Sequence, residues 1–395
     1  MRLSLRGWAS LIGGGLWSVG AVAAAQRDLL PIGLFLIALP LLSLLAMIPS
    51  RWRLRTARIL PDEAVPVGQP VGWRVGIEAG GLNPGGTGEL VETLDPALGP
   101  DVHVFFGQTL RAQYVTAEVR ATALRRGRHT VGPARVALRH ALGFAAVRRT
   151  TPETGQVVVT PAVTALGAKG DVPTANGGTQ APLGRAGVTS IDDAAIREYV
   201  DGDDIRRIHW RSTAHLGHFM VRREDSTWDP RAYILLDTRS DTFDEERPDP
   251  RFEAMITLVA SMTVHLLHSG YSVNLADTCG GMQALDADPL VAHQEALLLL
   301  ADADTQDGSL VIPPDIGRRS DTVIAVLAHA GPRDAQVLTT SARNGRALVM
   351  SGGPLPALDT QTTEMFADAG WRVVQIDVDT PPDLAWRTIV GGGGR

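Results

Sequence analysis

Two uncharged apolar stretches follow one another near the start of this 395-residue chain, at positions 7–25 and 29–48. A helix of about 20 apolar residues matches the roughly 30 Å hydrocarbon core of a bilayer. Only Gln26, Arg27 and Asp28 separate the two stretches, which leaves room only for a helical hairpin. A cleaved signal peptide is the competing interpretation of the first stretch, but the second would still anchor the protein. We therefore expect residues 1–52 to form a hairpin with two membrane spans.

The placement of arginines predicts the orientation of this hairpin. Arg2 and Arg6 flank the first stretch, and the second is followed by Arg51, Arg53, Arg55 and Arg58. The turn offers only Arg27, beside Asp28. The positive-inside rule then places both termini in the cytoplasm, so that the chain is a multi-pass protein of the cell membrane.

Charge and cysteine content exclude some classes of function. Residues 226–395 hold 12 basic and 24 acidic side chains, and this acidic balance disfavours a nucleic-acid partner. The single cysteine, Cys279, cannot form an internal disulfide and is compatible with a reducing compartment.

Residues 53–165 have the two-residue period of β-strands. Val71, Trp73, Val75 and Ile77 alternate with small or charged residues, which is typical of a half-buried strand. Several such short runs, separated by glycine- and proline-containing turns, predict a β-sandwich of immunoglobulin-like size. Modules of this kind usually bind other molecules or act as spacers between domains. We find no catalytic constellation in residues 53–165.

The chain changes character after this module. Residues 166–190 are rich in Gly, Pro and Thr and are predicted to be a flexible loop. From position 226 to the end, short apolar runs alternate with amphipathic helical patterns. Such alternation predicts a parallel sheet covered by helices on both faces, so the fold class is membrane-anchored α+β with a C-terminal α/β (Rossmann-type) domain.

The segment 191–225 is dense in charges of both signs. Gly202 permits a turn and Asp203 is a good helix N-cap, while Arg206 belongs to a group of six arginines interleaved with acidic residues. We expect a self-satisfied ion-pair network with Trp210 buried inside it. An anion site at the helix N-terminus is the alternative, although two aspartates there would repel phosphate.

This segment resembles the signature of the bacterial domain-of-unknown-function-58 (DUF58) family, roughly R-E-Y-x-x-G-D-x-x-R-x-I-x-W-x-x-[ST]-A followed by a glycine and V-R. The matching positions are Arg197, Glu198, Tyr199, Gly202, Asp203, Arg206, Ile208, Trp210, Ala214, Gly217, Val221 and Arg222. An upstream R-R-G-R element at 125–128 is similar to another family motif. His209, His215 and His140 depart from the usual pattern.

The resemblance implies a fold and partner proteins rather than a chemical reaction. Family members look like membrane-anchored proteins with a von Willebrand factor A-like C-terminal domain. They are typically associated with a MoxR-type AAA+ ATPase and a transglutaminase-like membrane protein, which are therefore the partners we expect beside the lipid bilayer.

A von Willebrand A domain of the binding kind holds a divalent metal through a D-x-S-x-S motif after its first strand. Here Arg239 and Asp241 stand where the two serines would be, after Asp237. A guanidinium would repel Mg²⁺ and pair with Asp237 instead, so we predict a degenerate site with no metal and no cofactor.

Three hypotheses about function remain. The first is a non-enzymatic, membrane-tethered adaptor that recruits a partner ATPase through its signature residues. The second is a Mg²⁺-dependent binding module, and the third is an unrecognised enzyme of the envelope. No catalytic residues are predicted, because Cys279 has no sequence-defined base and the motifs for phosphate binding or hydrolysis are missing from the sequence.

Overall fold

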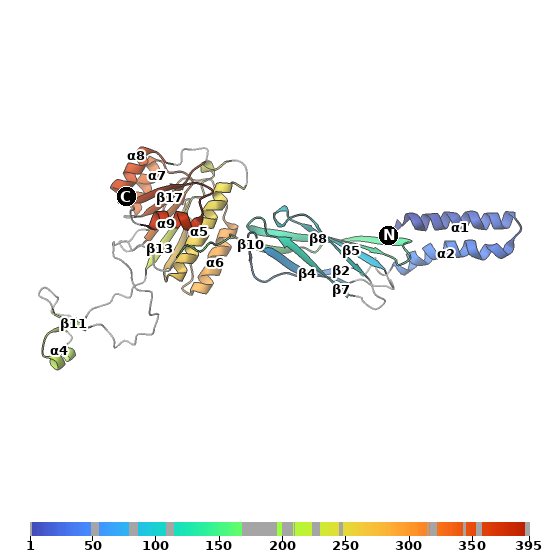
Figure 1. The fold of residues 1–395 in the computed structure, drawn as a ribbon, viewed down its shortest axis with the longest axis horizontal. Coiled ribbons are helices and arrows are strands. Elements are labelled where there is room, and N and C mark those ends of the chain that lie inside the picture. The colour runs from blue at the N-terminus through green and yellow to red at the C-terminus, as the bar shows by residue number, and fades with distance from the viewer. Residues whose placement is uncertain are drawn as a thin grey trace. The chain divides into compact units, whose positions relative to one another are not determined.

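A computed structural model describes residues 2–48, 55–78, 86–107, 114–167, 196–199, 208, 210–222, 230–244, 248–313, 316, 322–342, 345–352 and 358–391. The chain divides into two compact units (Figure 1). The N-terminal unit comprises Met1–Ala162 with Leu297–Ala303, and the C-terminal unit comprises Val163–Ala296 with Asp304–Arg395. Most of the predicted loop at 166–190 lies outside the described residues.

Two antiparallel helices begin the N-terminal unit, α1 (Leu5–Ala23) and α2 (Leu30–Ala46), joined through the short helix η1 (Arg27–Leu29). The Ser4 hydroxyl caps α1 by accepting from the Gly7 amide at 3.1 Å. Gly14 and Gly33 face one another closely, since a Cβ on Gly14 would lie 2.8 Å from the Gly33 carbonyl oxygen. Small residues at this contact allow the helix backbones to approach closely.

Only the second of the two predicted spans has the length and apolarity of a membrane helix. That helix covers Arg27–Ala46, and few of its residues are buried in the protein. The first stretch forms α1, but its glycines, tryptophans and serines, together with Arg6, make it much less apolar. The chain thus has one N-terminal apolar helix that could be a membrane span or a signal sequence, and the prediction of two spans is not confirmed.

A two-sheet β-module makes up the rest of the N-terminal unit, and its sheets share one core that includes Trp73, Val75, Leu90 and Val136. Its larger sheet has the order β1-β9-β8-β10-β3, with β5 pairing β8 and β6, and its smaller sheet has the order β2-β4-β7. All pairs are antiparallel except β10 with β3. The strands are β1 (Arg2–Leu3), β2 (Arg55–Ile59), β3 (Val65–Pro66), β4 (Pro70–Glu78), β5 (Thr87–Leu94), β6 (Val102–Gly107), β7 (Tyr114–Thr122), β8 (Gly127–Arg139), β9 (Ala145–Thr151) and β10 (Gly155–Thr160), with a short helix η2 (Pro96–Leu98).

A buried ion pair joins the two sheets. Arg58 lies on β2 of the smaller sheet and Glu92 on β5 of the larger one, and Arg58 Nε is 2.6 Å from Glu92 Oε1. The side chains are 4% and 0% exposed. Arg58 Nη1 also donates to the Glu153 carbonyl at 2.6 Å, so both the Glu92 carboxylate and this carbonyl stabilise the guanidinium.

The C-terminal unit is built on a six-stranded sheet of order β15-β14-β13-β16-β17-β18. Every pair is parallel except β14 with β15. Leu338 of α7 and Phe366 of α8 share a core with the sheet residues Leu235 and Val349, while α5 and α9 pack against the sheet and against one another. The elements are β13 (Arg231–Leu236), η4 (Ser240–Thr242), α5 (Pro250–His268), β14 (Ser272–Asp277), β15 (Met282–Ala284), α6 (Pro289–Asp302), β16 (Thr322–Leu327), α7 (Pro332–Ser341), β17 (Arg346–Met350), α8 (Thr360–Asp368), β18 (Arg372–Ile376) and α9 (Pro382–Val390).

The fold class is therefore α+β: N-terminal helices, an antiparallel module, and a mixed, mainly parallel α/β sheet. The parallel sheet agrees with the continuous apolar runs in its strands, since β16 is buried along its whole length.

Candidate functional site

The carboxyl ends of the central strands β13, β14 and β16 bring together the residues of the predicted degenerate metal site. Asp237 directly follows β13 and its side chain is fully buried. The Thr278 hydroxyl, after β14, donates to Asp237 Oδ1 at 3.1 Å, and the Ala328 amide, after β16, donates to Asp237 Oδ2 at 3.1 Å. Ligand sites of open α/β sheets gather at this edge.

The guanidinium of Arg239 lies between two buried carboxylates at this edge. Its Nε and Nη2 each lie 2.8 Å from an oxygen of Asp237, which makes a bidentate pair. Its Nη1 lies 3.1 Å from both oxygens of Asp334, and Nη2 also donates to the His329 carbonyl at 2.9 Å. The predicted pairing of Arg239 with Asp237 is thus present, and Asp334 is a second partner that sequence reasoning missed.

Asp334 belongs to α7, whose first turn it also stabilises by accepting from the Gly331 amide at 3.2 Å. Burial works against the charge of Arg239, but the hydrogen bonds and charges of Asp237 and Asp334 outweigh it and raise the pKa of Arg239. The positive charge is therefore permanent and occupies the position between the carboxylates.

Asp241 does not join this arrangement. It lies on η4, is exposed, and makes no hydrogen bond or ion pair with Asp237 or Arg239 in the described part of the chain. No group of three His, Cys, Asp or Glu side chains suited to a metal ion occurs among the described residues. The sulfur of the one cysteine, Cys279, lies 3.6 Å from the hydroxyl oxygen of Thr238. A threonine hydroxyl is not a base that would activate the thiol.

A second candidate is a small hairpin built from β11 (Ile196–Glu198), α4 (Trp210–Leu216) and β12 (Met220–Arg222). The two strands are antiparallel, with Glu198 opposite Met220. Gly217 ends α4 in the left-handed conformation (φ 78°), and its amide donates to the Thr213 carbonyl at 2.9 Å. The Thr213 hydroxyl in turn accepts from the Met220 amide at 3.0 Å and fixes the strand against the helix.

Aromatic side chains on this hairpin are exposed rather than buried. The ring of Phe219 lies edge-on to Tyr199 and to Trp210, at centroid distances of 6.1 and 6.4 Å. Trp210, Phe219 and Leu216 are 64%, 54% and 53% exposed, whereas Ile208 and Met220 are buried. We call Tyr199, Trp210, Leu216 and Phe219 the aromatic patch. The expectation of a buried Trp210 is wrong, because the short hairpin offers too little covering surface.

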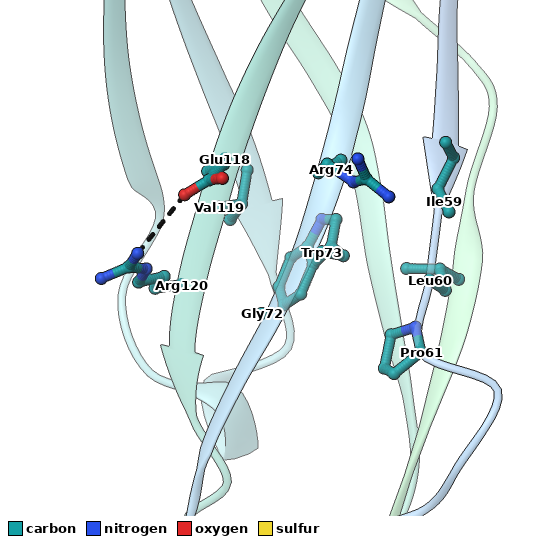
Figure 2. Close-up of a pocket in the computed structure, with 9 residues that line it drawn as sticks. All are labelled: Ile59, Leu60, Pro61, Gly72, Trp73, Arg74, Glu118, Val119 and Arg120. Atoms are coloured by element: carbon teal, nitrogen blue, oxygen red, sulfur yellow. Dashed lines mark hydrogen bonds and ion pairs between the residues drawn. The ribbon is translucent and has the colours of Figure 1, made fainter.

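A shallow pocket on the smaller sheet of the N-terminal unit is a third candidate (Figure 2). Glu118 and Arg120 lie beside it on β7 and form an exposed ion pair of 3.3 Å. Trp73 borders it from β4, and the described residues provide no hydrogen-bond partner for its buried indole nitrogen. The lining offers no nucleophile beside a base, so this pocket has no catalytic arrangement.

Comparison with family models gives a match for residues 195–285, to the family described as "Protein of unknown function DUF58". The chain contains a DUF58 domain. The match begins at β11 and includes the aromatic patch, the Asp237–Arg239 pair and β14.

The solved structures that resemble this chain have low sequence identity to it. A von Willebrand factor type A structure from Catenulispora acidiphila is 10% identical with a TM-score of 0.29, and the match covers 41% of each chain. A CARDB domain from Pyrococcus furiosus is 13% identical (TM-score 0.19), covering 27% of this chain and 86% of that one. This chain thus spans about two fifths of the von Willebrand structure, and curated proteins give no match.

The signature residues of the DUF58 domain are placed unevenly. Tyr199, Ile208, Trp210 and Ala214 are described, with Ala214 and His215 exposed on α4. Arg197, Glu198 and Arg222 belong to the paired strands, but their side chains are not described. The signature positions Gly202, Asp203 and Arg206, and also His209, lie outside the described residues, so the ion-pair network stays a prediction.

Proposed function

We propose that the protein is a non-enzymatic, membrane-tethered adaptor whose cytoplasmic domains bind partner proteins. The observation that carries this proposal is the aromatic patch of the DUF58 domain. Large aromatic side chains that remain exposed together, such as Trp210 and Phe219, are typical anchors of protein interfaces.

The charge around the patch indicates what kind of partner it fits. Residues 205–223 contain five arginines and three histidines, and acidic residues flank this run on both sides, with Asp203 and Asp204 before it and Glu224 and Asp225 after it. Arg211, His215 and His218 are exposed on or next to α4. The complementary surface is an acidic one with an apolar pocket for the aromatic rings. We propose a MoxR-type AAA+ ATPase as the first partner and a transglutaminase-like membrane protein as the second, following the family resemblance.

The proposed tether is the α1–α2 hairpin, in which both helices would cross the bilayer and α2 is the more apolar of the two. Both helices expose large apolar side chains, such as Leu16 and Val19 on α1 and Phe35 and Leu42 on α2. Lipid would cover this surface, and the contact at Gly14 and Gly33 would hold α1 within the same membrane region. The arginines at both ends of the hairpin support cytoplasmic termini and, with α1 embedded, a multi-pass topology. The β-module would then be an immunoglobulin-like spacer.

Partner binding in this proposal does not depend on Mg²⁺. Arg239 provides the positive charge that a metal would otherwise supply to Asp237 and Asp334. Titration of the full chain with Mg²⁺ and Mn²⁺ in a calorimeter should show no binding. Micromolar binding would instead support a metal-dependent von Willebrand A-type module.

The test is crosslinking of the full chain in native membranes, followed by purification and mass spectrometry. In the double variant Trp210→Ala/Phe219→Ala, the amount of crosslinked ATPase should fall at least tenfold. Leu290→Ala is the control, because Leu290 is an apolar side chain on α6 that is even more exposed than Trp210 and Phe219 and lies outside the aromatic patch. An unchanged set of partners in the double variant would refute the role of the aromatic patch.

The membrane orientation needs a separate test. A phosphatase that is active only outside the cytoplasm, fused after residue 395, should be inactive, while a cytoplasmic reporter at the same place should work. An active phosphatase would overturn the orientation and exclude a cytoplasmic ATPase as partner.

A further inference from the structure

Two arginines lie side by side at the amino edge of the C-terminal sheet, opposite to the edge that holds Asp237. Arg346 is the first residue of β17 and Arg372 the first residue of β18. The two strands are parallel, and these residues are direct partners in the register. Side chains of partnered residues on neighbouring strands project from the same face of a sheet, so the two guanidinium groups share one region.

Neither guanidinium has a carboxylate partner within 4 Å in the described part of the chain. Arg346 Nε is buried and has no hydrogen-bond partner there. Arg372 uses Nη2 to donate to the Thr388 carbonyl at the end of α9, at 2.6 Å. Among the described residues, the two positive charges therefore lie side by side without a carboxylate that neutralises them.

The buried arginines of this protein are arranged differently. Arg58 pairs with Glu92 at 2.6 Å, Arg239 with Asp237 at 2.8 Å, and Arg251 with Asp249 at 3.0 Å. Arg346 is only partly buried and has no such carboxylate partner among the described residues, and a charge that is partly removed from water without a partner is costly.

A buried phenol lies at the same edge of the sheet. Tyr271 is 6% exposed and directly precedes β14, which β13 and β16 separate from β17. Burial raises its pKa even though the charge of Arg346 acts in the opposite direction. Burial and the neighbouring Arg372 lower the pKa of Arg346, as expected for a cation that lacks an anion.

We infer that Arg346 and Arg372 form a binding site for a phosphate group of a small molecule. Two guanidinium groups match the charge of a phosphate, which is about −1.5 to −2 at neutral pH, and their planar N–H pairs fit its oxygen atoms. The inference is independent of the proposed adaptor function, because Arg346 and Arg372 lie on β17 and β18 and do not belong to the aromatic patch.

The test uses the full chain in detergent with inorganic phosphate as the probe. Calorimetric titration at constant ionic strength, with chloride as the reference anion, should give saturable binding at one site. Arg346→Gln and Arg372→Gln should each weaken this binding at least tenfold. Arg387→Gln is the matched control, because Arg387 is an exposed arginine on α9 that pairs with Asp383, and it should bind phosphate like the wild type.

A stability measurement distinguishes a binding site from a structural role. Without phosphate, Arg346→Gln should melt at or above the wild-type temperature, because it removes an unpaired, partly buried charge. With saturating phosphate the wild type should gain stability and Arg346→Gln should not. If Arg346→Gln does not fold, or if phosphate stabilises it as it does the wild type, the inference is wrong. Absence of saturable phosphate binding by the wild type would also refute it.

Discussion

Replacing Arg239 with serine removes the cation from the carboxyl edge of the C-terminal sheet and leaves Asp237 and Asp334 facing each other. Loss of one partner from a buried ion pair costs about 3–5 kcal/mol. For a unit of this size, 1 kcal/mol corresponds to about 2–4 °C in melting temperature, so the C-terminal unit should melt roughly 6–20 °C lower.

Differential scanning calorimetry of the full chain in detergent measures this effect, with two further variants for comparison. Arg239→Lys keeps the charge but loses the bidentate geometry, and it should lie between the serine variant and the wild type. Arg387→Ser removes an arginine that is 68% exposed and should not shift the melting temperature measurably. A serine variant at position 239 that melts within 2 °C of the wild type at pH 7 would show that the buried charges are solvated in some other way.

Three further predictions concern other parts of the molecule. Glu92→Ala should destabilise the N-terminal unit by about 3–5 kcal/mol in urea unfolding, because it strands the buried charge of Arg58; wild-type stability would contradict this. Burial and the neighbouring His268 lower the pKa of His293 from its ordinary value of 6.5, so the unfolded chain binds protons more readily and the C-terminal unit should lose stability as the pH falls below 6.5. His293→Gln should flatten this dependence between pH 5 and 7, and an equally steep profile would exclude His293 as its cause. Trp210→Ala should change the unfolding free energy by less than about 1 kcal/mol, since most of the ring is already in solvent; a larger loss would mean that the ring is covered in solution.

The sequence predicted those elements in which one local pattern decides the structure. The alternation at Val71, Trp73, Val75 and Ile77 corresponds to inward-facing, buried positions of β4. Asp237 and Arg239 are two residues apart, so their pairing could be derived from charge alone.

Features that depend on the three-dimensional arrangement could not be predicted from the sequence. Asp334 lies 95 positions after Arg239 and meets it only because α7 starts at the carboxyl edge of the sheet. Its position in the first turn of a helix after a buried strand was the one available signal. Arg346 and Arg372 likewise become neighbours only through strand pairing. Trp210 was mispredicted because a large aromatic residue is usually buried, and no local pattern shows that most of its ring is exposed in the described hairpin.

The pairing of Arg239 has a consequence for what this edge of the sheet can sense. A bound metal ion dissociates and rebinds, so its occupancy follows the concentration of the ion in solution. The guanidinium is attached to the chain by covalent bonds and has no dissociation rate. It joins the loop after β13, the loop after β16 and the first turn of α7 at all times. On our proposal this edge would not respond to divalent ions, and a signal that alters this domain would enter at another surface.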